Sequence, residues 1–283
     1  MTEGPLSRVT VLDLTDERGI YGAKLLADLG ANVIRPEPLT GDPLRTRGPF
    51  IQSTDQEKQS IWHAYFCSSR RSITLDLGSV EGSEQFELLL TKADIVLTCP
   101  GAFGVERSKE ILKNKNQEEL IFIDTCSFRP DCEWADYIAP DIVAGALGGQ
   151  IATTGDADTA PLKNFGELNF MVSGAYTAIS ALSALYNRRE TGSGQRVEVS
   201  VHECIASCLE HVFMFYWYGE AMEHPDGKVL PRRGSLHWSN AYDVMNAETG
   251  SIMVTPTPDF DKQLTWMICL LYTSDAADDT PCV

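Results

Sequence analysis

Apolar runs of strand length alternate with helix-spaced apolar positions through the first part of the chain. Residues 9–14 form a short apolar strand, helix-spaced apolar residues run from Tyr21 to Leu29, and a second strand occupies residues 32–34. Gly30 follows the predicted helix, at the position where glycine commonly ends one. The segment therefore predicts a βαβ unit.

The same alternation continues as far as residue 123. Further strands are predicted at residues 72–77, 95–97 and 120–123, with helices at 80–90 and 106–113 between them. Strands that alternate with helices imply a parallel sheet with helices on its faces. The sequence predicts an α/β fold with a Rossmann-like parallel sheet flanked by helices, followed by the start of a second, smaller domain.

Residues 170–187 carry no charged side chain and are rich in small ones, so a membrane span has to be weighed. A buried helix is the better interpretation, because the segment is only marginally long and its small residues suit close packing. A strand at 196–200 and a helix at 202–218 follow. The loop at 224–227 then suggests a domain boundary, giving a large domain over 1–223 and the start of a small one over 224–268.

Composition limits the classes of ligand and partner. The 283 residues include 40 acidic and 23 basic side chains, a formal charge of −17, which disfavours nucleic acid and anionic membranes. A phosphate-bearing ligand would need a local arginine cluster. The N-terminus carries no secretion signal, so we expect a cytoplasmic protein. The eight cysteines form no CxxC pair, which predicts free thiols.

Two kinds of site are disfavoured on residue grounds. The turn after the first strand, residues 15–19, contains Asp16 and Glu17 where a dinucleotide-binding turn would need glycines. Zinc is disfavoured because Cys204 and Cys208 share a helix face that His202 and His211 do not. We therefore predict neither an NAD site nor a metal site.

Three stretches resemble the family III CoA-transferases (CaiB/BaiF-type), the group that includes formyl-CoA transferases and α-methylacyl-CoA racemases. They are residues 11–45, with LLADLGANVIRPEP and GDPLR; residues 70–77, RRSITLDL; and residues 190–200, ETGSGQRVEVS. The resemblance implies a protein that moves CoA between carboxylic acids, with acyl-CoA as substrate and no covalently bound cofactor. It also implies an interlocked homo- or heterodimer with a family member.

The resemblance places CoA contacts at two groups of residues. Its phosphates would meet an arginine cluster, to which charge-assisted hydrogen bonds suit phosphate. A second stretch, usually Asn-Phe in the family, is here a Cys-Pro-Gly turn whose side chains do not reproduce those contacts. The candidate CoA-binding residues are Arg35, Arg45, Arg70, Arg71, Cys99 and Pro100. The alternative is that the arginines are surface residues paired with nearby acids.

The family's nucleophile is missing from this chain. In the transferases an aspartate four residues before a glycine, at the start of the long buried helix, attacks the acyl-CoA thioester; counting back from Gly174 gives Phe170. Glu167 is a possible surrogate. Alternatively, the chain belongs to a branch without the aspartate that works with a competent subunit or by other chemistry, or it is a non-catalytic CoA-binding or regulatory subunit.

Two further expectations concern Asp141 and the C-terminal residues. Family racemases resemble one another in a His-Asp step that is Pro140-Asp141 here, so racemisation is disfavoured and Asp141 is expected to cap the helix leading to Gly148. Residues 269–283 resemble a translated transposon sequencing adapter without helix or strand signals. We expect native sequence to stop near Ile268, within a truncated small domain.

Overall fold

The computed structural model of the chain describes residues 4–52, 58–113, 118–137, 139–155, 158–209, 212, 217, 243–246, 248–254 and 259–272. The chain divides into two compact units: one holds Met1–Ile151 and Lys163–Glu210, and the other holds Ala152–Leu162 and His211–Val283. The predicted boundary at 224–227 lies outside the described residues.

The first unit contains a six-stranded sheet in the order β5-β2-β1-β6-β7-β8. Each pairing between neighbouring strands in it is parallel. The strands are β1 (Thr10–Leu14), β2 (Asn32–Glu37), β5 (Arg71–Thr74), β6 (Ile95–Thr98), β7 (Ile121–Cys126) and β8 (Arg196–Ser200). The predicted α/β fold with a parallel sheet is confirmed.

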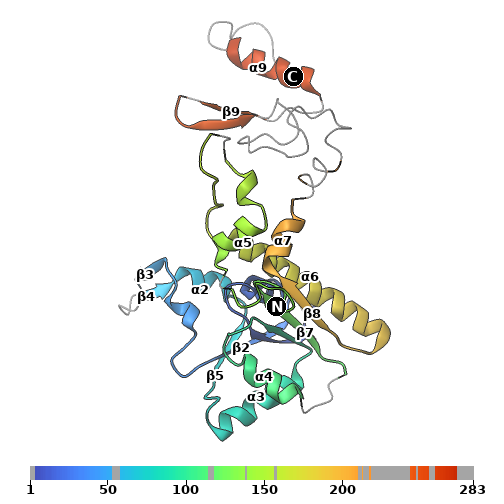
Figure 1. Cartoon of the computed structure of the whole chain (residues 1–283). Helices are drawn as coiled ribbons and strands as arrows, with labels where there is room; N and C mark the ends of the chain where they lie inside the picture. The colour runs from blue at the N-terminus through green and yellow to red at the C-terminus, as the bar shows by residue number, and fades with distance from the viewer. Residues whose placement is uncertain are drawn as a thin grey trace. The chain divides into compact units, whose positions relative to one another are not determined.

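Helices cover both faces of this sheet (Figure 1). On one face lie α1 (Ile20–Asp28) and α6 (Leu168–Thr191); on the other lie α3 (Val80–Lys92) and α4 (Val105–Lys113). Successive strand residues serve opposite faces, so Val11 packs in the core under α1 and α6 and Leu12 in the core under α3 and α4. Burial on both faces explains why the strands are continuous apolar runs.

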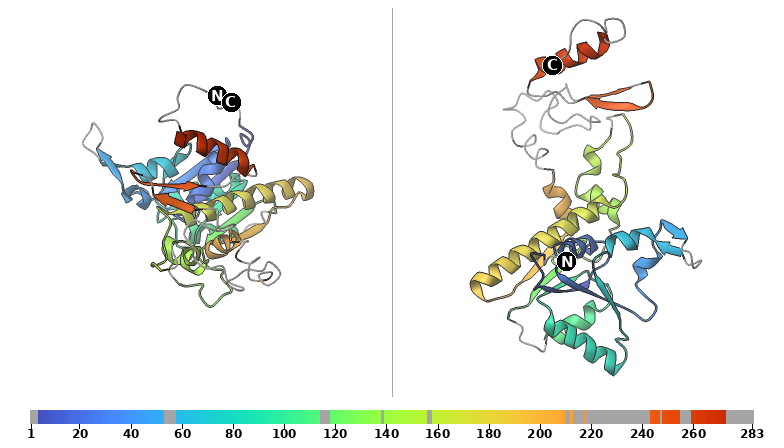
Figure 2. Two further views of the ribbon diagram at one scale, coloured as in Figure 1. Left: turned by 90° about the horizontal axis from the view of Figure 1, so that it is seen from above. Right: turned by 180° about the vertical axis from the view of Figure 1, so that it is seen from behind.

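Shorter elements complete the first unit, and Figure 2 shows the β3–β4 hairpin beside α2 at one side of the sheet. They are η1 (Pro43–Thr46), β3 (Phe50–Gln52), β4 (Lys58–Ser60), α2 (Ile61–Phe66), α5 (Asp141–Leu147) and α7 (Val201–Ser207). The short turn η2 (Ile151–Thr153) has its first residue in this unit and the other two in the second.

Helix α6 is buried along one face, as the small residues in its sequence predict. Among the described residues it is the one helix long and apolar enough to cross a membrane, and half of its most apolar window is buried within the protein. Ala178 and Ala181 pack into the core beneath α1. Burial against a sheet and a neighbouring helix is the behaviour of a core helix.

The predicted continuous helix at 202–218 is interrupted, because α7 ends at Ser207 and residues 208 and 209 are not helical. Of the remaining residues only 212 and 217 are described, and both are helical. The hydroxyl of Ser207 donates to the carbonyl oxygen of Cys204 at 2.7 Å, and the thiol of Cys208 donates to the same oxygen. The backbone N–H groups of Cys208 and Leu209 bond to carbonyls three residues back. Side-chain hydrogen bonds thus compete with the helical pattern and end the helix.

The second unit contains the antiparallel pair β9 (Asp243–Asn246) and β10 (Ser251–Val254), and the helix α9 (Phe260–Tyr272). Helix α9 continues through residues 269–272, so regular structure extends four residues into the segment that resembles an adapter translation. Residues 273–283 lie outside the described part of the chain.

Candidate functional site

The topology marks one edge of the sheet as the place for a ligand. Strands β1 and β6 are neighbours, but the chain leaves β1 for α1 on one face and leaves β6 for α4 on the other. Such a reversal opens a crevice at the carboxyl ends of the strands, where α/β proteins bind their ligands. A cavity of about 230 Å³ lies there. Its lining includes Thr15 and Asp16 after β1, Pro38 after β2, and Gly101 and Phe103 after β6.

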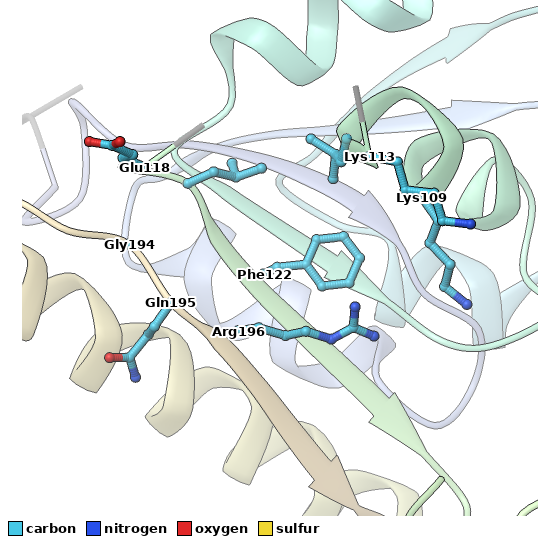
Figure 3. A pocket seen from close by; sticks show the side chains of 9 residues that line it. Lys109, Lys113, Glu118, Phe122, Gly194, Gln195 and Arg196 are labelled. Atoms are coloured by element: carbon cyan, nitrogen blue, oxygen red, sulfur yellow. The ribbon is translucent and has the colours of Figure 1, made fainter. Parts of the chain in front are cut away.

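A larger cavity of about 480 Å³ lies at the opposite, amino-terminal end of β7 and β8. Figure 3 shows the side chain of Arg196 beside the ring of Phe122, and its guanidinium carbon lies 5.0 Å from the ring centroid. Arg196 also pairs with Asp124, and Lys109 pairs with Glu106. The topology therefore favours the smaller cavity as the ligand site.

Arg35 lines the crevice and forms ion pairs within its wall. It is 7% exposed, and its guanidinium donates to Asp42 at 2.5 Å, to Asp13 at 3.1 Å and to the carbonyl oxygen of Thr15 at 3.0 Å. Burial alone would raise the pKa of Asp13, but Arg35, Arg70 and Thr15 outweigh it and hold this pKa below its ordinary value. The charge of Arg35 is thus already matched by carboxylates.

The other three predicted arginines differ in how far their charges are matched. The side chain of Arg70 is 2% exposed, and it bonds to Asp13 and to the carbonyl oxygen of Ile20. Arg45 is half exposed and donates two hydrogen bonds, of 2.9 and 2.6 Å, to the carboxylate of Glu37. Arg71 is exposed, and no acid among the described residues pairs with it. The structure therefore leaves Arg71 as the most available cation of the set.

The Cys99-Pro100 step directly precedes Gly101, Ala102 and Phe103, which line the crevice. Cys99 is completely buried, and burial raises the pKa of its thiol. The carbonyl oxygen of Pro100 accepts a 2.7 Å hydrogen bond from Arg18, and Arg18 also donates to the carboxylate of Asp16. Arg18 thereby ties the turn after β1 to the turn after β6. Neither Cys99 nor Pro100 is among the residues that line the cavity.

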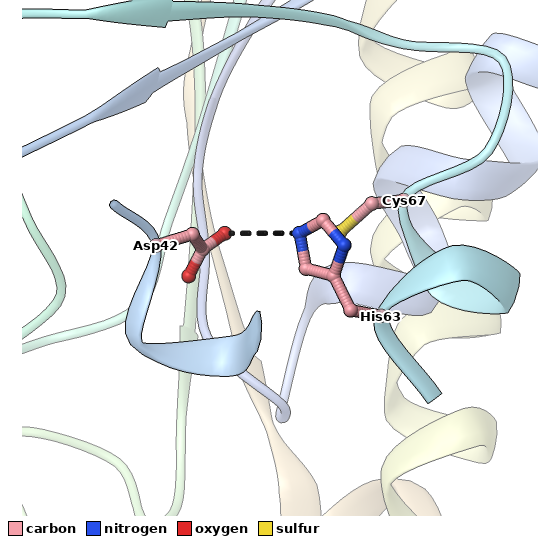
Figure 4. A group of neighbouring side chains, drawn as sticks. All are labelled: Asp42, His63 and Cys67. Carbon is pink, nitrogen blue, oxygen red and sulfur yellow. Dashed lines mark ion pairs between the residues drawn. The ribbon is translucent and has the colours of Figure 1, made fainter. Parts of the chain in front are cut away.

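One side-chain cluster has the donor types of a metal site. Figure 4 shows the imidazole of His63 between the carboxylate of Asp42 and the sulfur of Cys67, and their ligand atoms lie within 4.8 Å of one another. However, Arg35 donates to the same Asp42 carboxylate at 2.5 Å, and burial raises the pKa of Cys67 to about 11. A guanidinium at the carboxylate and a protonated thiol both disfavour a divalent cation.

The start of α6 is the second part of the candidate site. Phe170 is 5% exposed and packs against Ala144 and Val201. Glu167, one turn earlier, is bound by Arg47 and by the indole N–H of Trp62 at 3.1 Å; the Arg47 guanidinium lies 4.6 Å from the Trp62 ring centroid. These contacts turn the Glu167 carboxylate away from the helix backbone, to which it makes no capping hydrogen bond.

Asp141 lies at this same place, a result that sequence reasoning missed. The N-cap residue of α5 is Pro140, and the Asp141 carboxylate accepts the backbone N–H of Phe170 at 3.1 Å. It also accepts from Asn169 at 3.0 Å and lies 3.1 Å from the ammonium of Lys163. The expectation that Asp141 caps the helix leading to Gly148 is therefore wrong, because the donor it meets belongs to α6.

A sequence profile of CoA-transferase family III matches residues 6–268. The chain belongs to CoA-transferase family III. The chain spans between about half and two thirds of the length of the curated relatives described next.

Two curated relatives and one solved structure illustrate the similarity to family III members. The succinyl-CoA:mesaconate CoA-transferase of Haloarcula hispanica is 29% identical over 265 residues, covering 90% of this chain and 65% of the relative. The succinyl-CoA:(R)-benzylsuccinate CoA-transferase subunit BbsE of Thauera aromatica is 32% identical, covering 81% of this chain and 54% of the relative. A CaiB/BaiF family protein of Brucella suis has a TM-score of 0.79 at 28% identity, covering 95% of this chain and 71% of that one.

Proposed function

We propose that the protein binds acyl-CoA and takes part in moving CoA between carboxylic acids. The crevice at the carboxyl ends of β1, β2 and β6 carries this proposal, because it is the ligand position of the topology in a chain that belongs to family III. A cavity of about 230 Å³ is too small for a whole CoA molecule and suits its adenine end.

Arg71, the first residue of β5, is the proposed phosphate ligand. Register places Arg71 opposite Ile34 and Ile73 opposite Pro36, so these residues share one face, and Pro36 lines the cavity. Arg71 projects from this face without an acidic partner among the described residues. Arg35 and Arg70 instead hold the crevice walls in place through Asp13.

A dicarboxylic acid is the proposed substrate class. The relatives act, by name, with succinyl-CoA and mesaconate, with (R)-benzylsuccinate, with oxalate, and with succinate and glutarate. These compounds share the presence of a dicarboxylic acid on at least one side of the exchange. Succinyl-CoA, formyl-CoA and acetyl-CoA are therefore the donors to test first.

A second candidate function is a CoA-binding subunit that works with a competent family member. Two observations favour it: Phe170 stands where a family aspartate is expected, and the BbsE relative is named as a subunit. Purification of the protein from its native host would separate the two candidates. A stoichiometric family partner supports the subunit function, whereas transfer by the protein alone supports the self-sufficient enzyme.

Calorimetric titration of CoA and 3′-dephospho-CoA into the full-length protein tests the CoA site. Arg71→Ala is expected to weaken CoA binding about tenfold, the effect of losing one charge-assisted hydrogen bond. Arg189→Ala, an exposed arginine in the last turn of α6, is the matched control and should leave binding unchanged. If the wild-type protein binds neither compound, the proposed function is wrong.

A further inference from the structure

The first turn of α6 takes its acceptor from another helix. A helix N-terminus presents backbone N–H groups that the residue before the helix usually satisfies with its own side chain. In α6 that residue is Glu167, and it makes no such bond because Arg47 and Trp62 hold its carboxylate. The carboxylate of Asp141 accepts the N–H of Phe170 in its place.

The local sequence of α5 fixes Asp141 in this position. Pro140 precedes it, and one turn later Gly145 lies directly against Asn169, where a β-carbon would come within 2.6 Å of the Asn169 amide nitrogen. This close approach brings α5 and α6 together. Asn169 in turn donates to the backbone and to the carboxylate of Asp141, at 3.1 and 3.0 Å.

Fixed donors and a cation surround the Asp141 carboxylate. The residue is 6% exposed, the ammonium of Lys163 lies 3.1 Å from its Oδ2, and the positive end of the α6 dipole faces it. Its Oδ1 accepts one hydrogen bond among the described residues, from Phe170. A carboxylate held in one orientation by fixed donors is a preorganised nucleophile.

The reaction proposed above needs such a group. Exchange of CoA between two carboxylic acids without an external energy source requires a carrier that forms an anhydride and a thioester of comparable energy, and a carboxylate can form both. We propose that Asp141 is the nucleophilic carboxylate of this chain, in place of the residue at position 170. This inference rests on the proposed CoA-transfer function.

The covalent steps balance with Asp141 as carrier. Its Oδ1 attacks the thioester carbonyl carbon of the donor; the new C–O bond forms, the C–S bond breaks, and CoA leaves as the thiolate. The thiolate then attacks the carboxyl carbon of Asp141, releasing the donor acid and leaving an Asp141–CoA thioester. The acceptor carboxylate attacks that thioester and expels CoA thiolate, which attacks the acceptor carbonyl carbon and regenerates Asp141.

Glu167 is the competing carboxylate at this helix. Its two oxygens are bound by Arg47 and by Trp62, so a ligand must displace an ion pair or an indole N–H to reach it. Its side chain is 22% exposed, against 7% for Asp141. An experiment can distinguish the two residues by locating the side chain to which an acyl or CoA group becomes attached.

The test combines covalent trapping with mass spectrometry on the full-length protein. The protein is incubated with succinyl-CoA, formyl-CoA or acetyl-CoA, quenched with hydroxylamine, and digested to locate the hydroxamate. We expect the hydroxamate on Asp141 and its loss in Asp141→Asn, with turnover at least a thousandfold lower. The asparagine oxygen can still accept the N–H of Phe170, so folding is preserved. Asp131→Asn, at an exposed aspartate paired with Arg129, is the matched control.

Calorimetric CoA binding, measured in parallel, separates failure of this inference from failure of the proposed function. If CoA binds but the hydroxamate lies on Glu167, or no donor gives a hydroxamate on Asp141, then Asp141 serves only to cap α6 and the inference is overturned. Wild-type labelling is independent of any variant, so an unstable Asp141→Asn protein does not weaken the test. Absence of CoA binding overturns the proposed function itself.

Discussion

Gly22 and Gly174 touch where α1 crosses α6. A β-carbon on Gly22 would lie 2.6 Å from the carbonyl oxygen of Gly174, and one on Gly174 would lie 2.9 Å from the backbone nitrogen of Gly22. The absence of side chains on both residues lets the two helix backbones meet. This contact fixes how α6 lies on the sheet, and with it the position of Phe170 and Asp141.

Gly22→Ala is expected to destabilise the protein by about 1–3 kcal/mol, because the added methyl group meets backbone atoms that cannot rotate away. Urea unfolding followed by circular dichroism measures the loss. Ser183→Ala, at an exposed position on α6, is the control and should change the free energy of unfolding by less than about 0.5 kcal/mol. Wild-type stability in Gly22→Ala would show that the helices can separate.

Arg70→Ala is expected to lower the free energy of unfolding by about 3–5 kcal/mol, because it leaves the fully buried Asp13 carboxylate short of a partner. Arg71→Ala removes an exposed cation and should cost less than about 0.5 kcal/mol. Chemical unfolding of both variants makes the comparison. If Asp13→Asn, added to Arg70→Ala, restores none of the loss, the buried ion pair is not its cause.

The lowered pKa of the Glu37 carboxyl leads us to expect a loss of folding stability in acid. Burial alone would raise the pKa of Glu37, but hydrogen bonds from Arg45, Ser72 and the Asp42 N–H lower it from 4.5 to about 2. A lowered pKa in the folded state stabilises the protein above the unfolded pKa, and this stabilisation is lost as the pH falls from about 4.5 to about 2.

The stability of wild-type protein should therefore fall more steeply over this pH interval than that of Glu37→Gln. The urea midpoint measured at several pH values gives the two slopes. Glu84→Gln, at an exposed position on α3, should keep the wild-type slope. Equal slopes for wild-type protein and Glu37→Gln would assign the acid sensitivity to other carboxylates.

Phe170→Asp is expected to destabilise the protein by at least about 3 kcal/mol and to leave it without increased transfer activity. The change removes a ring packed against Ala144 and Val201 and brings a second carboxylate toward Asp141. Phe170→Leu retains an apolar side chain and should cost less. Unfolding and CoA-transfer assays on both variants test this, and a stable, more active Phe170→Asp protein would contradict it.

The order of strands and helices could be predicted from the sequence. The apolar runs at 9–14, 95–97 and 120–123 became neighbouring parallel strands, because a strand buried on both faces needs consecutive apolar residues. The small residues of the uncharged segment at 170–187 likewise predicted close packing, which Gly174 provides. The family could also be recognised from the sequence, since its motifs lie in these same segments.

Tertiary structure alone decided which charges remain available and which carboxylate meets α6. Sequence separation does not reveal that Arg70 reaches Asp13 across 57 residues, or that Asp141 reaches the N–H of Phe170 across 29. Both pairings form because packing of whole elements brings distant side chains together in a poorly solvated place, where an unpaired charge or N–H group is costly. Local patterns therefore determined the elements of this protein, and the packing of those elements determined the chemistry of its site.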